Sequence, residues 1–349
     1  MNIEPIAVYS GNIVIYWSGI VIALGIAAGF MLANAIYTSH HGRSSALWVM
    51  LPFAMVLSIF FCRILHWYCH EEQYVSLYRA ITDYSGGSYC LPGALLGVYL
   101  GALISTKLGF ADSVGKILDA VAPGFSLTIA LIRLSSLFNS SCHSKYVIEK
   151  NFFKRLPFGA PLIDSAGNAD WRFATFFVEF LLMLLVMGLL IFIYYHLHNS
   201  RMNPPCRRNG NVFRLFLVLY GAITLVLDST RNDSSFLHFP GVLKVLNKFA
   251  GFVSMAQLVA ALCILFVIVY YSKCSRKSGS KAKRWLIWVG YIISLAMVGG
   301  CEYCVQRWSN LYRLCYLGMS FGVILMSLMA FLMYKTCIRT INDIEDEYE

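Results

Sequence analysis

The chain has 349 residues, of which 58% are apolar and only 13% charged, and its mean hydropathy is +0.64. This composition excludes an ordinary soluble globular protein and indicates a polytopic membrane protein. Much of the net charge of +10 lies in loops beside apolar runs. The charge therefore predicts contact with membrane surfaces and no nucleic-acid partner.

Nine apolar runs are long enough to cross about 30 Å of hydrocarbon, which takes roughly 20 helical residues. They cover residues 12–37, 46–68, 89–106, 115–138, 173–197, 212–230, 252–272, 285–304 and 314–334. Their length and their Leu, Ile, Val and Phe content suit helices better than barrel strands. We predict an all-α integral membrane bundle of about nine transmembrane helices. The start, MNIEPIAVYSGN, has no basic region or cleavage site, so we expect the first span to be retained.

Basic residues predict the orientation. The loop between spans five and six contains Arg201, Arg207, Arg208 and Arg214, and the loop between spans seven and eight contains Lys273, Arg276, Lys277, Lys281, Lys283 and Arg284. The opposing loops hold Lys145, Lys150, Lys154, Arg155, Lys244 and Lys248. The positive-inside rule then favours an amino terminus outside and a carboxyl terminus in the cytoplasm.

The loops also suggest how the chain is divided. Residues 141–172 are punctuated by Gly and Pro, which argues against one continuous helix and leaves two interpretations, an extracytoplasmic cap or an ordinary connector. The basic loop 273–284 separates a core, 1–272, from residues 285–349, which hold two further spans and an acidic tail. We expect the core to carry the function.

The 11 cysteines are scattered along the chain, several of them within apolar runs. Cys301 and Cys304 form the one C-x-x-C pair, and the sequence places no further ligands beside them. We therefore expect neither a metal nor a cofactor. Cysteines in apolar spans usually behave as small hydrophobic residues.

Charged residues within the spans follow a pattern. They fall near the end of even-numbered spans and near the start of odd-numbered ones. Because consecutive spans run in opposite directions, this alternation places them at one face of the bilayer. In span four, Arg133 lies on a polar stripe with Ser126, Ser136 and Ser140, and Asn139 is alongside. The stripe predicts an arginine that faces the bundle interior, and the alternative is snorkelling toward headgroups.

Other spans supply further polar groups at that depth. Glu179 lies two turns into span five, and span six ends with Tyr220, Asp228 and Arg231. A structural ion-pair network explains these residues as well as catalysis does. Arg63 in span two fits snorkelling beside Trp67 and Tyr68, and Gln257 in span seven fits an interhelical hydrogen bond. If the arginines do bind a ligand, the anion available at this depth is a phospholipid phosphate.

These segments resemble the prolipoprotein diacylglyceryl transferases, bacterial enzymes with seven spans. FFCRILHWY is similar to their G-A-R-x-x-Y, GALLGVYLG to the end of H-G-G-L-x-G, and LDAVAPGFSLTIALIRLSSLFNSS to L-D-x-x-A-P followed by G-R-x-G-N-F-x-N. WRFATFFVE stands in place of R-H-P-[ST]-Q-L-Y-E, LYGAITLVLDSTR in place of Y-G-x-x-R-x-x-x-E-x-x-R, and VSMAQL in place of L-S-M-G-Q. The resemblance covers residues 1–272 and implies a transferase in the bacterial cytoplasmic membrane.

Some signature side chains of that family are replaced in this chain. The family histidine falls on Pro92, its asparagine and acidic residue on Ser136 and Ser141, its span-six arginine on Thr224 and its first-span tyrosine on Ser18. The resemblance implies catalytic roles for Arg133, Glu179, Asp228 and Tyr220. It implies headgroup contacts for Arg133, Arg231, Asn139, Arg63, Gly93 and Gln257. The scaffold is thus matched more fully than the reactive set.

The reaction that the resemblance implies moves a diacylglyceryl group from phosphatidylglycerol to the lipobox cysteine of a prolipoprotein signal peptide. A thiol with a pKa near 8.5 needs a base or a positive field, and the departing phosphate needs cations. Glu179, Asp228 or His143 is a candidate base, and His143 also reads as a plain loop residue. Two alternatives stay open: a lapsed paralogue that binds phospholipid or precursor without turnover, and a solute transporter, for which no inverted repeat is evident.

Overall fold

The computed structural model describes residues 5–10, 13–41, 43–71, 74, 76–82, 90–139, 142–163, 169–199, 209–234, 236–237, 251–276, 281–308 and 311–345. Several residues named above lie outside these ranges. They are Ser140, Ser141, Arg201, Arg207, Arg208, Lys244, Lys248 and Lys277. The predicted roles of these residues in the polar stripe and in the charge asymmetry therefore stay predictions.

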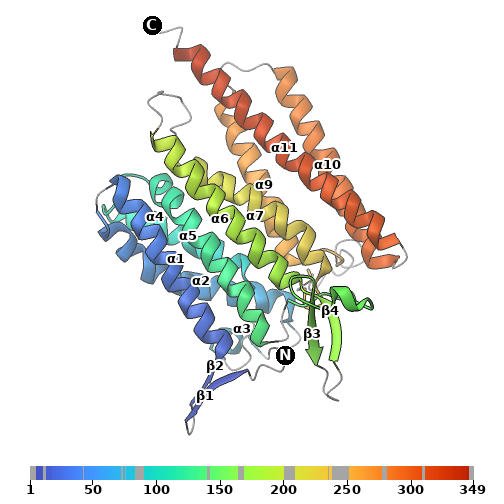
Figure 1. Cartoon of the computed structure of the whole chain (residues 1–349). Coiled ribbons are helices and arrows are strands. Elements are labelled where there is room, and N and C mark those ends of the chain that lie inside the picture. Colours follow the sequence, from blue (N-terminus) through green and yellow to red (C-terminus); the bar gives the residue numbers. More distant parts are fainter. Residues whose placement is uncertain are drawn as a thin grey trace.

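The chain is an all-α bundle with two small strand pairs (Figure 1). Its helices are α1 (Trp17–His41), α2 (Ser45–Cys69), α3 (Leu77–Thr82), α4 (Pro92–Lys107), α5 (Val114–Leu134), α6 (Thr175–Asn199), α7 (Asn211–Thr230), α9 (Met255–Cys274), α10 (Lys281–Arg307) and α11 (Tyr312–Glu345). Within the described ranges, eight of these helices are long and apolar enough to span a membrane. The polytopic helical fold is thereby confirmed.

The expected third span, 89–106, differs from the others. Its helix, α4, has only 16 residues and starts at Pro92. Proline suits this first position, because its fixed φ is already helical and the missing N–H would have no partner there. Three glycines let α4 pack against α2 at backbone distance. A Cβ at Gly93 or Gly97 would collide with the backbone of Cys62 or Ser58, and one at Gly101 would lie 2.8 Å from the Cβ of Ala54.

Strands precede the first helix. The pairing of β1 (Ile6–Ser10) with β2 (Ile13–Tyr16) is antiparallel, and α1 follows directly at Trp17. The first apolar run, expected from residue 12, thus begins as a strand. Three consecutive β-branched residues, Ile13, Val14 and Ile15, are followed by Tyr16, and these residue types favour strand over helix.

The segment expected as a cap or connector holds the second strand pair. β3 (Gly159–Ile163) pairs with β4 (Ala169–Phe173), and β4 leads into α6. Its first residues contact the end of α7: the Lys145 N–H and the Ser144 hydroxyl both donate to the Thr230 carbonyl oxygen, each at 2.9 Å. The segment is therefore tied to the same end of the bundle as Arg133.

The last two helices form an antiparallel hairpin along one side of the molecule, where α11 packs on α7 and α9 (Figure 1). The Tyr316 hydroxyl lies 3.1 Å from both the Ser229 carbonyl oxygen and the Tyr146 hydroxyl. The ring of Tyr146 also stacks on Tyr312, with centroids 4.9 Å apart. The hairpin thus contacts the end of α7 and the segment that follows α5.

Candidate functional site

The site forms where four helix ends meet. α5 and α7 end there, α6 and α9 begin there, and the described loops fill the space between them. α9 begins with a capping box, in which the Ser254 hydroxyl accepts the Gln257 N–H and the Gln257 side chain accepts the Ser254 N–H. The alternation of charged residues along the spans therefore does bring them to one end of the bundle.

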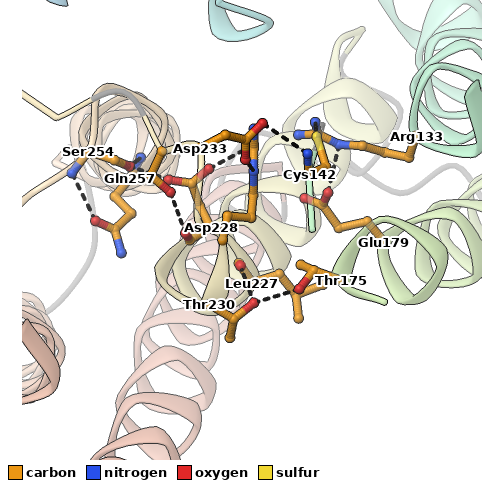
Figure 2. A network of polar contacts seen from close by, with 12 residues as sticks. Arg133, Cys142, Thr175, Glu179, Leu227, Asp228, Thr230, Asp233, Ser254 and Gln257 are labelled. Atoms are coloured by element: carbon orange, nitrogen blue, oxygen red, sulfur yellow. Dashed lines mark hydrogen bonds and ion pairs between the residues drawn. The ribbon is translucent and has the colours of Figure 1, made fainter. Parts of the chain in front are cut away.

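The centre of the site is a buried ion pair. Arg133 Nε lies 2.7 Å from Glu179 Oε2, and the two side chains are 8% and 3% exposed (Figure 2). This burial excludes the alternative of snorkelling toward headgroups. Removing one partner of such a buried pair strongly destabilises the folded protein, because the other charge is then buried without compensation.

A cysteine and an aspartate extend the network toward α7 (Figure 2). Arg133 Nη1 donates to Cys142 Sγ at 3.1 Å, and the Cys142 N–H donates to Asp233 Oδ2 at 2.9 Å. Cys142 has a φ of 59°, in the left-handed region that is costly for residues other than glycine. The contacts on both sides of Cys142 hold this conformation.

Arg231 connects two carboxylates. Its Nε donates to Asp233 Oδ1 at 3.0 Å and its Nη1 to Asp228 Oδ1 at 2.9 Å. The Ser254 hydroxyl donates a hydrogen bond to Asp228 Oδ2. The network thus runs without a break from Glu179 on α6 to the start of α9.

The charges within the network do not cancel. Its described residues hold two guanidinium groups, Arg133 and Arg231, and three carboxyl groups, Glu179, Asp228 and Asp233. Burial raises the pKa of Asp233, but Arg231 and the Cys142 N–H outweigh it and hold that pKa below its ordinary value. Each arginine uses Nε and Nη1, and Nη2 of both has no hydrogen-bond partner among the described residues.

Of the other three residues expected in the site, two lie beside the network and one is exposed. Tyr220 is 2% exposed within α7, two turns before Asp228, interacts electrostatically with Arg133 and Glu179, and stacks on Phe216 with ring centroids 5.7 Å apart. Gln257 Nε2 donates to the Leu225 carbonyl oxygen at 3.3 Å, which is the interhelical hydrogen bond that the sequence suggested. Asn139 is exposed just after the short 3-10 helix that ends α5.

The remaining two candidates belong to the α2 and α4 pair. Arg63 is 2% exposed and faces the ring of Tyr74, whose centroid lies 6.0 Å away, so the prediction that Arg63 snorkels is wrong. It directly follows Cys62, whose backbone lies against Gly93. Gly93 has an evident packing role, because any side chain there would force α4 away from α2.

His143 follows Cys142 directly and is 5% exposed. Its ring lies 5.1 Å from the ring of Phe176, which is one turn before Glu179 on α6. The Asn232 N–H donates to its carbonyl oxygen at 2.9 Å. The imidazole is therefore packed inside the site and is more than an exposed loop side chain.

Sequence reasoning missed Cys142, Asp233 and Ser254. The capping pattern S-x-x-Q was the available signal for Ser254. Asp233 lies two residues after Arg231 in STRND, and nothing in that spacing shows that its carboxylate accepts a distant backbone N–H. Among the described residues no group of three His, Cys, Asp or Glu side chains is placed to hold a metal ion.

The fold and the site define a class: a polytopic membrane protein with a charged network at one end of its helices. A family model described as prolipoprotein diacylglyceryl transferase matches residues 5–273, about three quarters of the chain. The chain belongs to the prolipoprotein diacylglyceryl transferase family.

Curated relatives agree with this assignment. A Dehalococcoides mccartyi protein is 24% identical over 286 residues, covering 79% of this chain and 96% of its own. A Streptococcus suis protein is 27% identical over 246 residues, 69% of this chain and 85% of its own. A Streptococcus pyogenes protein is 25% identical over 279 residues, covering 79% of this chain and 97% of its own. Each is named phosphatidylglycerol–prolipoprotein diacylglyceryl transferase.

Proposed function

We propose that this chain transfers the diacylglyceryl group of phosphatidylglycerol to the lipobox cysteine thiol of a prolipoprotein. A carbon–sulfur bond forms at the glyceryl carbon, the carbon–oxygen bond to the phosphate breaks, and glycerol phosphate leaves. The proton leaves the attacking thiol. Family membership, the names of the relatives and the charged network at the helix ends all support this proposal.

One observation carries the proposal. Arg133 and Arg231 are fixed by carboxylates on one edge, while Nη2 of each keeps its donors for a further anion. A guanidinium group matches the planar geometry of phosphate oxygens and stays charged in a buried site. These two groups would bind the headgroup phosphate and stabilise the charge that develops on it as the bond to carbon breaks.

His143 is our candidate for the base that takes the thiol proton. Glu179 and Asp228 each already form an ion pair with an arginine, so their carboxylates are engaged within the network. A neutral imidazole has an ordinary pKa near 6.5, close to the working pH. His143 lies beside the network on the Phe176 face of α6, and it would substitute for the imidazole that the family has where this chain has Pro92.

The lapsed paralogue is the second candidate, and a specific observation favours it. The carboxyl groups outnumber the guanidinium groups by three to two, so a phosphate must compete with them for the arginines. Asp233, whose side chain is 38% exposed, is the most accessible of the three. A chain that binds phospholipid or precursor at the rim, without turnover, would have this balance of charge.

The proposed placement puts the network on the outer face of a bacterial cytoplasmic membrane, with the amino terminus outside and the carboxyl terminus inside. Lys273, Arg276, Lys281, Lys283 and Arg284 lie at the opposite ends of α9 and α10, in keeping with the positive-inside rule. We further propose a core of 1–272 with 141–172 as its cap, the basic loop 273–284, and 285–349 as an addition. The extent of the family match supports that division.

The test combines complementation with chemistry. Cells depleted of their own transferase receive the full chain, and the purified protein is incubated with phosphatidylglycerol and a lipobox peptide, which is then weighed by mass spectrometry. A diacylglyceryl mass gain that Arg133→Ala and His143→Ala abolish supports the enzyme, and the exposed Arg43→Ala is the matched control. Phospholipid binding without a modified peptide supports the lapsed paralogue.

A further inference from the structure

A groove runs along the bundle between α4, α7 and α9 and reaches the start of α5. Its volume is about 590 Å³. Its mouth is apolar and faces outward, because Leu96, Tyr99, Leu262 and Phe266 are between 41% and 52% exposed. In a membrane these side chains lie against lipid, so the groove opens sideways into the bilayer.

The polar lining of this groove lies at the end of the bundle opposite Arg133. Arg214 is one turn into α7 and 8% exposed, and the ring of Tyr270 covers its guanidinium carbon at 3.7 Å from the centroid. Arg214 Nη1 donates to Asn211 Oδ1 at 2.7 Å and Nη2 to the Asn209 carbonyl oxygen at 3.3 Å. Neutral groups thus hold the guanidinium in place.

No carboxylate pairs with Arg214 among the described residues. The nearby acid is Asp119, whose oxygens accept the N–H groups of Gly210 and Phe213 at 2.6 and 2.9 Å. Asp119 thus secures the start of α7, and its charge also acts on Arg214 from beyond ion-pair distance. Because no carboxylate contacts the guanidinium directly among the described residues, a lipid phosphate at this end of the groove can add a charge-assisted contact.

We propose that this groove binds an anionic phospholipid of the leaflet at that end of the bundle. The lipid phosphate contacts Arg214 and Asn209, and one acyl chain lies along α4 and α9. Arg214 is one turn inside the helix end, the depth at which lipid phosphates meet a span. The phosphate end of this groove lies away from the network at Arg133, while Pro92 lines the groove farther along α4. The proposal does not depend on the proposed transferase activity.

The experiment counts bound lipids. The full chain is purified in mild detergent, supplied with phosphatidylglycerol or with zwitterionic phosphatidylethanolamine, and analysed by native mass spectrometry. We expect Arg214→Gln to weaken retention of one phosphatidylglycerol by about tenfold, as expected for the loss of a charge-assisted hydrogen bond. The matched control is Arg43→Gln, which removes an exposed charge elsewhere and leaves the lipid count unchanged.

A second variant keeps the proposal testable if Arg214→Gln misfolds. Leu262→Trp fills the mouth of the groove without touching Arg214, and we expect the same loss of one lipid. Two results would overturn the proposal: an unchanged lipid count in Leu262→Trp, or displacement of the lipid by millimolar inorganic phosphate alone. Peptide lipidation is measured in parallel, and its absence counts against the proposed function and leaves the groove proposal intact.

Discussion

The two ends of the bundle both bury an arginine and an aspartate, yet they use them differently. At one end Arg133 and Arg231 pair with carboxylates from α6, α7 and the following loop. At the other end Asp119 accepts backbone N–H groups at the start of α7, and Arg214 is held by neutral partners. The first arrangement joins separate elements through charge, and the second secures one helix end.

This difference predicts how each end responds to change. A network of charges from several elements fails as a unit when one member is lost, because the partner becomes an uncompensated buried charge. A cap loses only the hydrogen bonds that it makes. The following predictions test that contrast, from the largest expected effect to the smallest.

The largest effect is expected for Glu179→Leu. Arg133 would remain charged and buried, and breaking a buried pair typically costs about 3 to 5 kcal/mol of unfolding free energy. The measurement is reversible unfolding in mixed micelles. The double variant Arg133→Met with Glu179→Leu removes both charges and should recover most of the loss. If the double variant is less stable than Glu179→Leu, the pair is not the main stabilising contact of Glu179.

Asp119→Ala should have a smaller effect. It leaves the Gly210 and Phe213 N–H groups without their acceptor, which costs about 1 to 3 kcal/mol. Asp119→Asn keeps one side-chain acceptor and is expected to lose less. The same unfolding assay applies. An equal loss in Asp119→Asn and Asp119→Ala would show that the negative charge of Asp119 matters more than its hydrogen bonds.

Much of the architecture could be predicted from the sequence, because spans of about 20 apolar residues admit few alternatives in a bilayer. Arg133 and Asp228 lie near the ends of their spans and Glu179 lies near the start of its span. Because consecutive spans run in opposite directions, these positions alone place all three residues at the same end of the bundle. The contacts of Cys142 and Asp233 could not be predicted. They depend on how a loop after α5 folds against a loop after α7, and no helical or strand period constrains either loop.

The missed strands and the short span have similar causes. The apolar stretch of β2 continues without a break into α1 at Trp17, so its consecutive apolar residues could not be told from the start of a helix. In α4 the apolar run begins before the helix does, because Pro92 sets the first turn. Glycines at 93, 97 and 101 were the available sign of close packing on α2.

Tyr316→Phe tests whether the terminal hairpin supports the charged end. The variant keeps the ring and removes the hydroxyl that contacts Ser229 and Tyr146. We expect a loss of about 1 kcal/mol, typical of one hydrogen bond. Tyr303→Phe on α10, at a more exposed position, is the control and should change stability by less than about 0.5 kcal/mol. Equal losses in the two variants would argue against a specific contact.

The smallest effect concerns pH. The pKa of Asp233 is lower in the folded chain than the ordinary value near 3.9. Its stabilising contribution is therefore complete above that ordinary pKa and is lost as the pH falls through the folded pKa. Asp233→Asn removes the contribution, so the stability difference between wild type and variant should shrink in acid. Asp112→Asn removes an exposed carboxylate and controls for the change in net charge. If the stability difference between wild type and Asp233→Asn stayed constant with pH, Asp233 would not have a lowered pKa in the folded chain.

The shortness of α4 has a consequence for the surrounding lipid. Its 16 residues rise about 24 Å along the helix axis, several Å less than the thickness of the hydrocarbon layer. Because α4 is fastened to α2 through glycine backbone, it cannot shift to share the mismatch with its neighbour. The bilayer beside α4 is then locally thinner, so the lipid headgroups next to this helix lie closer to the bilayer centre.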